Sequence, residues 1–298
     1  MRTPTRSLLP CALLLALAGC GGGAPPAAGA HAASALAVDL DDRAAADARN
    51  DEGDLPGDES PRLPVMAAPL AAGVSIRSIA SDTWTHWPES LAANVADADN
   101  LYTGSNQRLA WPGVNGATKY ENYANCAGFV TRSLKQAFGL DNADFTQWMG
   151  STGPSSARYH DTIVAGNRFV RITRATDVAR GDIVAIKYLD ATSGGTGHTM
   201  VAQGTPMLRS VATKPVIPGT VQYELRVIDS TSSPHGATDT RRGTGPNGSD
   251  QDGAGFGTIR LYADTAGSIV GYTWSLSTAS TYYTAATRSL VVGRLSGL

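Results

Sequence analysis

The segment Tyr123-Ala124-Asn125-Cys126-Ala127-Gly128-Phe129-Val130 decides the fold that we expect for this chain. It has the pattern of a loop that runs into a helix, with Cys126 at the helix start. Further on, apolar side chains recur at spacings of three and four, and a glycine follows at position 139. This pattern predicts an amphipathic helix from Cys126 to about Phe138, with one face available for packing.

Cys126 is also the expected free thiol of the mature protein. The sequence has three cysteines, and the other two, Cys11 and Cys20, lie in an apolar leader. An exported protein meets an oxidising compartment, where an unpaired thiol is a liability unless it is buried or used. Cys126 is therefore a candidate nucleophile, and the alternative is a buried small hydrophobic residue.

The N-terminus has the features of a lipoprotein leader. A short basic region precedes an apolar stretch from Leu8 to Ala18, which is too short to span a bilayer. The stretch closes with Leu17-Ala18-Gly19-Cys20, the pattern at which a bacterial lipoprotein is cut and lipidated. We therefore expect a signal peptide over residues 1–19 and a lipid on Cys20. The alternative is a plain signal peptide cut near Ala30.

Cellular location and domain organisation follow from the same region. Gly21, rather than an aspartate, follows Cys20, which favours the outer membrane of a Gram-negative bacterium, on its periplasmic face. Residues 20–78 are rich in Ala, Gly, Pro and Asp, so we expect a disordered tether. Residues 79–298 suit one globular catalytic domain. The net charge of −2 indicates neither nucleic acid nor an anionic membrane surface as a partner.

The periodicity of the sequence changes after the helices, which sets the expected fold class. Pro88-Glu89-Ser90 opens one helix and Ser156–Val164 forms another, while residues 100–118 are loop-like. The expected strands cover residues 169–172, 183–188, 198–202, 223–228, 257–262 and 269–274. Helices come first and strands follow. The chain is therefore predicted to be α+β, with the Cys126 helix packed on an antiparallel sheet.

A nucleophilic cysteine needs a base and a group that orients the base. His198 opens one expected strand, and Asp229 directly follows another, Tyr223–Ile228. If these strands pair antiparallel, the start of one lies beside the end of the other, and a carboxylate-imidazole hydrogen bond becomes possible. His198 can then take the thiol proton, and Asp229 can fix the ring orientation. Asp229 could instead cap a turn.

Three short motifs together resemble the NlpC/P60 superfamily of papain-like cysteine peptidases and amidases. They are Asn125-Cys126-Ala127-Gly128-Phe129-Val130, Gly181-Asp182-Ile183-Val184 and Gly197-His198-Thr199-Met200-Val201. The resemblance covers roughly residues 120–230. It implies a papain-like core with Cys126 as nucleophile, His198 as base and Asp229 as the third residue. It also implies that the backbone N–H of Cys126 contributes to the oxyanion hole.

The chain departs from this family at two positions beside the cysteine. Asn125 and Ala127 stand where the family typically has aspartate and serine, which in the cell-wall peptidases help to hold the amine of a stem peptide. Its third residue is also more often histidine than aspartate. The chain therefore resembles a divergent branch of this superfamily.

Several other residues are weaker candidates. Tyr120 and Tyr123 precede the cysteine, where they could line the substrate groove or pack on the loop. His160 is expected to pack or to cap a helix, and His235 to lie in a loop at the pocket rim. Arg241, with its neighbour Arg242, is expected in a solvated loop, with binding of a substrate carboxylate as the alternative. The histidines lack metal-ligand spacing, so we expect no metal site and no cofactor.

These observations predict a cysteine hydrolase that cleaves a peptide or amide bond through an acyl-enzyme. Its partners would be a peptide or amide substrate, with peptidoglycan as a candidate, and a membrane bound through the lipid on Cys20. One alternative is a catalytically inactive binding or scaffolding lipoprotein of the same fold, which the Asn-Cys-Ala-Gly departure motivates. Another is an acyltransferase, because the same acyl-enzyme can be resolved by an amine or a hydroxyl.

Overall fold

A computed structural model describes residues 83–190 and 195–297 of the chain. The expected signal peptide, the lipidation site Cys20 and the tether over residues 20–78 lie outside the described residues. Among the helices that the structure describes, none combines the length and the apolar character that a bilayer crossing requires.

Helices dominate the first half of the described chain. The α-helices are α2 (His86–Asn94), α3 (Cys126–Phe138), α4 (Asn142–Met149) and α5 (Ser156–Val164). Short 3₁₀ turns cover Asp97–Asp99, Ala175–Asp177 and Pro246–Gly248. The strands are β1 (Asn100–Leu101), β2 (Arg108–Ala110), β3 (Glu121–Tyr123), β4 (Phe169–Ile172), β5 (Ile183–Tyr188), β6 (Gly197–Ala202), β7 (Met207–Leu208), β8 (Val221–Thr231), β9 (Gly253–Ala263), β10 (Ile269–Thr273), β11 (Tyr282–Thr284) and β12 (Arg288–Leu295).

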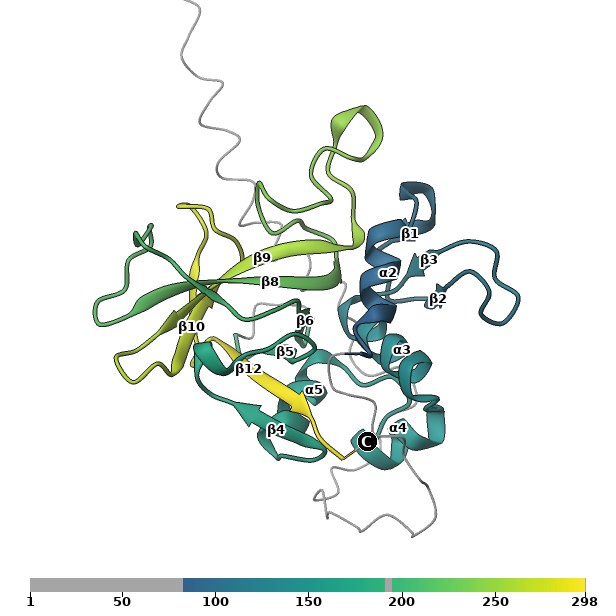
Figure 1. The fold of residues 1–298 in the computed structure, drawn as a ribbon, viewed down its shortest axis with the longest axis horizontal. Helices are drawn as coiled ribbons and strands as arrows, with labels where there is room; N and C mark the ends of the chain where they lie inside the picture. Colours follow the sequence, from purple (N-terminus) through teal and green to yellow (C-terminus); the bar gives the residue numbers. More distant parts are fainter. Residues whose placement is uncertain (1–82, 191–194, 298) are drawn as a thin grey trace, which may run out of the picture.

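The main sheet is antiparallel and strongly curled. Its nine strands run in the order β11-β10-β9-β8-β6-β5-β12-β4, with β7 paired to β8. An isolated bridge joins Arg174, just after β4, to Ser268, just before β10, so the two ends of the sheet approach each other. Figure 1 shows the long β8–β9 pair crossing above β5, β12 and β4, as the twist requires. β1, β3 and β2 form a separate three-stranded sheet.

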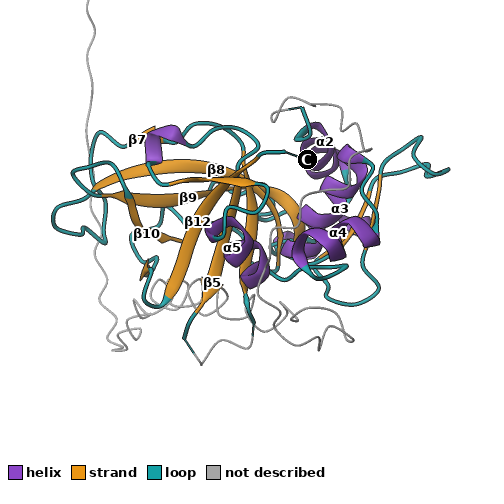
Figure 2. Ribbon diagram, turned by 90° about the horizontal axis from the view of Figure 1, so that it is seen from below, coloured by secondary structure: helices purple, strands orange, loops and turns teal. Residues whose placement is uncertain are grey.

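Helices cover one face of the main sheet. α3 packs on β6 and β8, α5 packs on β4, β5, β6 and β12, and α2 contacts α3, β8 and β9. Figure 2 shows α2, α3 and α4 grouped at one side of the orange strands. Side chains alternate between the two faces of each strand, so the sheet separates two hydrophobic cores. Val201 and Ile228 join the cluster beneath the helices, whereas Met200 and Val227 join the cluster inside the curl. The α+β fold with an antiparallel sheet is therefore confirmed.

The Cys126 helix has the predicted bounds because both of its ends are specified locally. At its start, the Asn125 side chain accepts a hydrogen bond from the Gly128 N–H, which satisfies one of the exposed donors of the first turn. At its end, Gly139 adopts a left-handed conformation with φ of 67°, which costs a glycine little. Cys126 is thus the first residue of α3, as predicted.

Other elements differ from the sequence expectations. β8 runs on to Thr231, so Asp229 lies inside a strand rather than after it. The expected loop over residues 100–118 contains β1 and β2. α4 and β12 were not predicted, although Asp141 and Asp144 form a capping box at the start of α4. The strand β12 lies between β4 and β5, a position that no local sequence signal specifies.

Candidate active site

The sheet opens between β6 and β8 at the predicted site. These strands pair only through Val201–Ile228 and Ala202–Val227, while β6 pairs with β5 from Gly197 to Val201 and β8 pairs with β9 along its whole length. Asp229 lies one residue and His198 three residues beyond the last pair. Side chains rather than backbone hydrogen bonds join the two strands there.

His198 and Asp229 form the hydrogen bond that the strand pairing predicted. The Nε2 atom of His198 lies 2.7 Å from Oδ2 of Asp229, and both side chains are buried. A carboxylate accepts, so the proton of this bond belongs to Nε2 of His198. The carboxylate therefore orients the imidazole and leaves Nδ1 as the ring nitrogen that could take a proton from a nucleophile.

Two further groups hold the Asp229 carboxylate. Arg241 donates from Nη1 to Oδ1 at 2.9 Å, and Nε2 of His235 lies 2.8 Å from Oδ2. Burial alone would raise the pKa of Asp229, but the charges of His235 and Arg241 and the hydrogen bonds of both histidines hold it well below its ordinary value. Asp229 is therefore ionised at neutral pH despite its complete burial.

The hydrogen bonds of His235 orient its ring. Its Nδ1 lies 2.9 Å from the carbonyl oxygen of Trp274, and its Nε2 meets the Asp229 carboxylate. The carbonyl oxygen can only accept, so Nδ1 donates to Trp274, and Nε2 is the ring nitrogen that meets Asp229. The ring also stacks on Trp274, with centroids 4.0 Å apart. His235 lies in a loop, as expected, but the expected place at the pocket rim is wrong, because these contacts bury His235 to 1% exposure.

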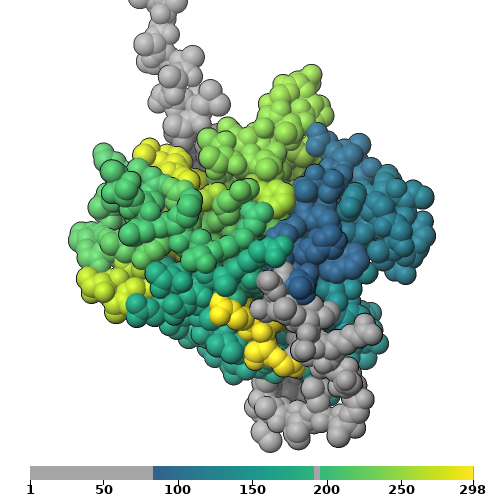
Figure 3. Space-filling view, viewed as in Figure 1, coloured from purple at the N-terminus to yellow at the C-terminus, as the bar shows by residue number. Residues whose placement is uncertain are grey.

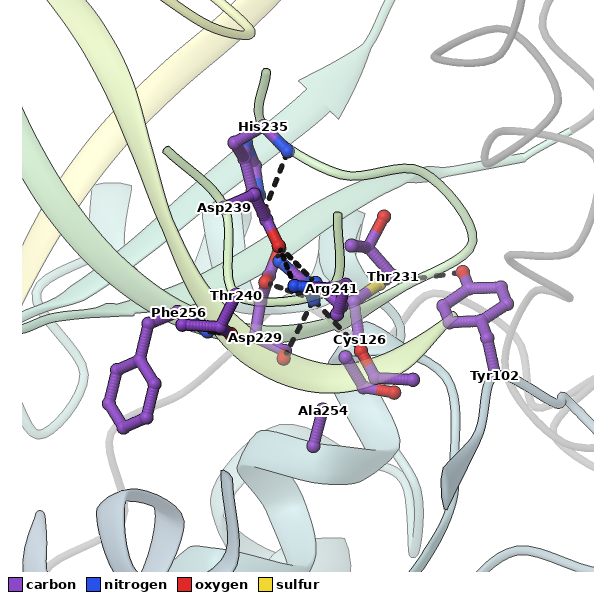
Figure 4. A network of polar contacts seen from close by, with 12 residues as sticks. Tyr102, Cys126, Asp229, Thr231, His235, Asp239, Thr240, Arg241, Ala254 and Phe256 are labelled. Atoms are coloured by element: carbon purple, nitrogen blue, oxygen red, sulfur yellow. Dashed lines mark hydrogen bonds and ion pairs between the residues drawn. The ribbon is translucent and has the colours of Figure 1, made fainter. Parts of the chain in front are cut away.

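Arg241 is likewise buried, so the expectation of a solvated loop is wrong for this residue. Its guanidinium donates to Oδ1 of Asp239 from Nε and to Oδ2 of Asp239 from Nη2, at 2.8 and 2.7 Å. Figure 4 shows it between Asp229 and Asp239. Despite the cost of burial, these two carboxylates raise the pKa of Arg241 above its ordinary value. Its neighbour Arg242 pairs with Asp250 at the surface.

The charged groups of this buried cluster are paired. Arg241 contacts both Asp229 and Asp239, and His235 meets Asp229 from another side. Burying charges costs much less when each has a hydrogen-bonded partner of opposite sign. The His198 ring lies beside these four residues and contacts the Asp229 carboxylate. A neutral imidazole oriented by a carboxylate is the form that acts as a general base.

Two glycines on β9 make room for the cluster. Gly255 lies opposite Asp229 in the β8–β9 register, and Gly257 lies two residues along the same face. A Cβ at Gly255 would lie 2.8 Å from Nε of Arg241, and a Cβ at Gly257 would lie 2.3 Å from Cδ2 of His235. Any side chain at these positions would displace the groups that hold Asp229.

The Cys126 sulfur lies among hydroxyl groups and is fully buried. It is 4.0 Å from the hydroxyl of Tyr102 and 3.4 Å from Oγ of Ser156. Figure 4 shows the Tyr102 hydroxyl directed toward Cys126. Ser156 is itself buried, whereas Tyr102 keeps 6% exposure. Tyr102 is therefore the more exposed of these two contacts of the sulfur.

Hydrogen bonds tie the start of α3 to the neighbours of both His198 and Asp229. Ser230, next to Asp229, donates from Oγ to the carbonyl of Ala124 at 2.7 Å. Thr199, next to His198, donates to Oγ of Ser156, which in turn contacts the Cys126 sulfur. These bonds place the start of α3 beside Thr199 and Ser230, which alternate with His198 and Asp229 along the two strands. A direct contact between the sulfur and the His198 ring stays a prediction.

Tyr120 and Tyr123 lie near α3 in sequence but have other neighbours. The guanidinium carbon of Arg108 lies 3.7 Å from the centroid of the Tyr123 ring, and the Tyr123 hydroxyl lies 3.5 Å from the carbonyl of Ala98. Tyr120 packs, half-buried, against the core cluster beneath the helices. Their role in substrate binding stays a prediction.

His160 forms a separate polar group on α5. Its Nδ1 lies 2.9 Å from Oδ1 of Asp161, and its Nε2 lies 2.9 Å from Oγ of Ser289 on β12. Burial lowers the pKa of His160, against the opposing effect of Asp161. The residue packs between α5 and β12, in agreement with the expectation of a packing role.

Among the described residues, His198, Asp229 and His235 have the spacing of a metal site, with one ligand atom from each within 4.8 Å of the others. Their hydrogen bonds favour a proton network instead. Both ring nitrogens of His235 already have partners, Trp274 and Asp229, and Arg241 shares the carboxylate. A cation would have to displace both histidine protons from Asp229.

The sequence did not predict the roles of three residues of this site: Tyr102, His235 and Arg241. Tyr102 gave no signal, because it lies in a stretch without periodicity. The pair Asp239 and Arg241 could be recognised as an i, i+2 ion pair, but nothing local predicts that it folds back over Asp229.

Comparison with known proteins gives one informative relative. Over 217 residues the chain is 34% identical to uncharacterized protein R653 of Acanthamoeba polyphaga mimivirus, an alignment that covers 70% of this chain and 94% of the viral protein. The chain belongs to the family of this viral protein. No family model matches the sequence, and no solved structure matches the fold.

Proposed function

We propose that the protein is a cysteine hydrolase that cleaves a peptide or amide bond, with Cys126 as nucleophile, His198 as base and Asp229 as the orienting residue. The hydrogen bond between His198 and Asp229 is the observation that carries this proposal. It fixes Nδ1 of His198 as the proton acceptor. The placement of Cys126 at the start of α3 supports the proposal, because the backbone N–H groups there stabilise a thiolate.

The proposed reaction has two steps. The Cys126 sulfur attacks the substrate carbonyl while its proton passes to Nδ1 of His198, and a carbon-sulfur bond forms. The carbon-nitrogen bond then breaks, and the leaving amine takes the proton from His198. In the second step His198 removes a proton from water, the hydroxide attacks the thioester, and the free acid and the thiol are released. The Cys126 N–H would stabilise the oxyanion in both steps.

The order of these residues supports a papain-like core of the NlpC/P60 type. In that arrangement the nucleophile opens a helix packed on an antiparallel sheet, and the base opens a strand of the sheet. We carry over from it the candidate substrate class, peptides of the bacterial cell wall. The lipid anchor at Cys20 and the periplasmic face of the outer membrane remain part of this proposal.

Burial of the site favours a second candidate function. Cys126, His198 and Asp229 are all at 0% exposure, so a substrate reaches the sulfur only after a movement of its cover. A binding or scaffolding protein of the same fold would keep such a site closed. The two functions differ in whether an acyl-enzyme forms.

Incubation of the purified protein with peptidoglycan and with a mixed peptide library, followed by mass spectrometry, tests the proposal. We expect new amino termini in the products, and loss of all turnover in Cys126→Ala. Circular dichroism of that variant shows whether it remains folded. Added amine acceptors that appear in the products would identify an acyltransferase. Cleavage that persists in a folded Cys126→Ala protein would overturn the mechanism.

A further inference from the structure

A cleft with a volume of about 830 Å³ lies between α2 and the β8–β9 pair, on the helix-covered face of the sheet. This volume is in the range of ligand-binding pockets. In the space-filling view, the blue surface of α2 adjoins the green surface of the segments from β6 to β9 (Figure 3). Phe256, Leu276 and Met207 supply its apolar surface.

The charges that line the cleft leave one cation uncompensated. Glu89 accepts from Nε of Arg180 at 2.8 Å, and Glu224 pairs with Arg209. Arg226 also lines the cleft; its side chain is exposed and forms no hydrogen bond or ion pair with the described residues. An arginine in such a position is suited to bidentate binding of a carboxylate.

A second polar group in the cleft lacks a partner. The side-chain oxygen of Gln203 is buried and forms no hydrogen bond with any described residue. Leaving such an acceptor unsatisfied is costly, so it indicates a donor supplied from outside the fold. Gln203 follows β6, and its backbone N–H donates to the carbonyl of Arg226. The two polar groups therefore belong to adjacent strands of one wall.

The cleft is connected to the candidate active site through two residues. Phe256 packs against the core cluster that contains Cys126, and its backbone pairs with Thr240, next to Arg241. Thr238, which lines the cleft, precedes Asp239 of the buried charge cluster. A ligand in the cleft would thus contact the segment that holds Asp229 in place.

We infer that this cleft binds an acidic segment of a peptide, with Arg226 on a carboxylate and Gln203 on a backbone N–H. A peptide satisfies all three features, because it combines N–H donors, apolar carbon and an acidic side chain. The inference rests on the proposed function only in naming the peptide as substrate. Binding at the cleft is a separate property, which can be measured without turnover.

The test uses the full-length Cys126→Ala protein, which cannot turn over substrate, and two acetylated tripeptides, Ala-Glu-Ala and Ala-Gln-Ala. Titration calorimetry or NMR is expected to show saturable binding of the acidic tripeptide, with the neutral one about tenfold weaker or more. Arg226→Gln, added to Cys126→Ala, should remove this preference, and Gln203→Ala should weaken both peptides. Arg242→Gln is the matched control, an arginine that pairs with Asp250 and does not line the cleft.

The outcomes separate this inference from the proposed function. Acidic-peptide binding that depends on Arg226, together with an absence of hydrolysis by the wild-type protein, would support the cleft and overturn the hydrolase. Absence of saturable binding, or equal binding of both tripeptides in the presence of Arg226, would overturn the cleft inference. Binding that Arg242→Gln reduces as strongly as Arg226→Gln would also overturn it.

Discussion

His198 and Asp229 are 31 residues apart in sequence, and their side chains meet at 2.7 Å in the opening between β6 and β8. The meeting depends on a third segment. Residues 235–241 fold back over the strand, so that His235 and Arg241 hold the carboxylate from its other sides. The imidazole of His198 is therefore oriented by a carboxylate that is itself fixed in position and in charge.

Removing Arg241 should destabilise the protein far more than removing its neighbour. Arg241→Met leaves Asp229 and Asp239 buried without their guanidinium partner, and breaking such a buried pair costs roughly 3–5 kcal/mol. Arg242→Met breaks only an exposed ion pair with Asp250, and the loss should stay within about 1 kcal/mol. Urea unfolding of both variants gives the comparison. Similar losses for the two would contradict the buried charge cluster.

The Asp229 carboxylate should make the free energy of unfolding depend on pH in the acidic range. Its pKa in the folded protein is well below the ordinary value, because His235 and Arg241 outweigh the effect of burial. The unfolded chain therefore binds a proton before the folded one does, as the pH falls below about 4. The stabilising contribution is complete above that pH and is lost progressively below it.

Asp229→Asn isolates this contribution. The free energy of unfolding of the wild type should exceed that of Asp229→Asn most near neutral pH, and the difference should narrow as the pH falls below about 4. Denaturant titrations at a series of pH values measure the difference. A gap that stays constant down to pH 2 would show that the Asp229 pKa is not depressed by its partners.

Tyr102 should control access to the thiol. Its hydroxyl contacts the Cys126 sulfur, and the residue keeps 6% exposure, whereas the sulfur is fully buried. Tyr102→Ala should speed reaction of Cys126 with iodoacetamide by about tenfold, equivalent to a decrease of about 1.4 kcal/mol in the free energy of opening. Tyr102→Phe keeps the ring and should react nearly as the wild type does. Equal rates in all three proteins would mean that iodoacetamide reaches Cys126 by a route that Tyr102 does not control.

Local signals predicted the elements that carry the site. The bounds of α3 follow from Asn125 and Gly139, and the pairing of β6 with β8 brings His198 to Asp229 as antiparallel strands require. Sequence alone did not predict the burial of His235 and Arg241. Their segment has the composition of a surface loop, and its position depends on the room left by Gly255 and Gly257 on a strand that was expected to begin later.

The insertion of β12 between β4 and β5 could not be predicted for a related reason. The strand lies about a hundred residues from its partners in sequence, so only the closure of the whole sheet specifies its position. The contact of Tyr102 with Cys126 is of the same kind, because it joins the small β1–β3 sheet to the start of α3.

The pH dependence of Cys126 alkylation, measured in the wild type and in His198→Gln, tests the central claim most directly. Circular dichroism confirms that both proteins are folded. A free thiol has a pKa of about 8.5, and we expect the wild-type alkylation rate to rise with pH through an inflection well below that value. In His198→Gln the inflection should move up toward the value of the free thiol. An inflection near 8.5 in both proteins would show that His198 does not activate the sulfur, and would contradict the proposed hydrolase.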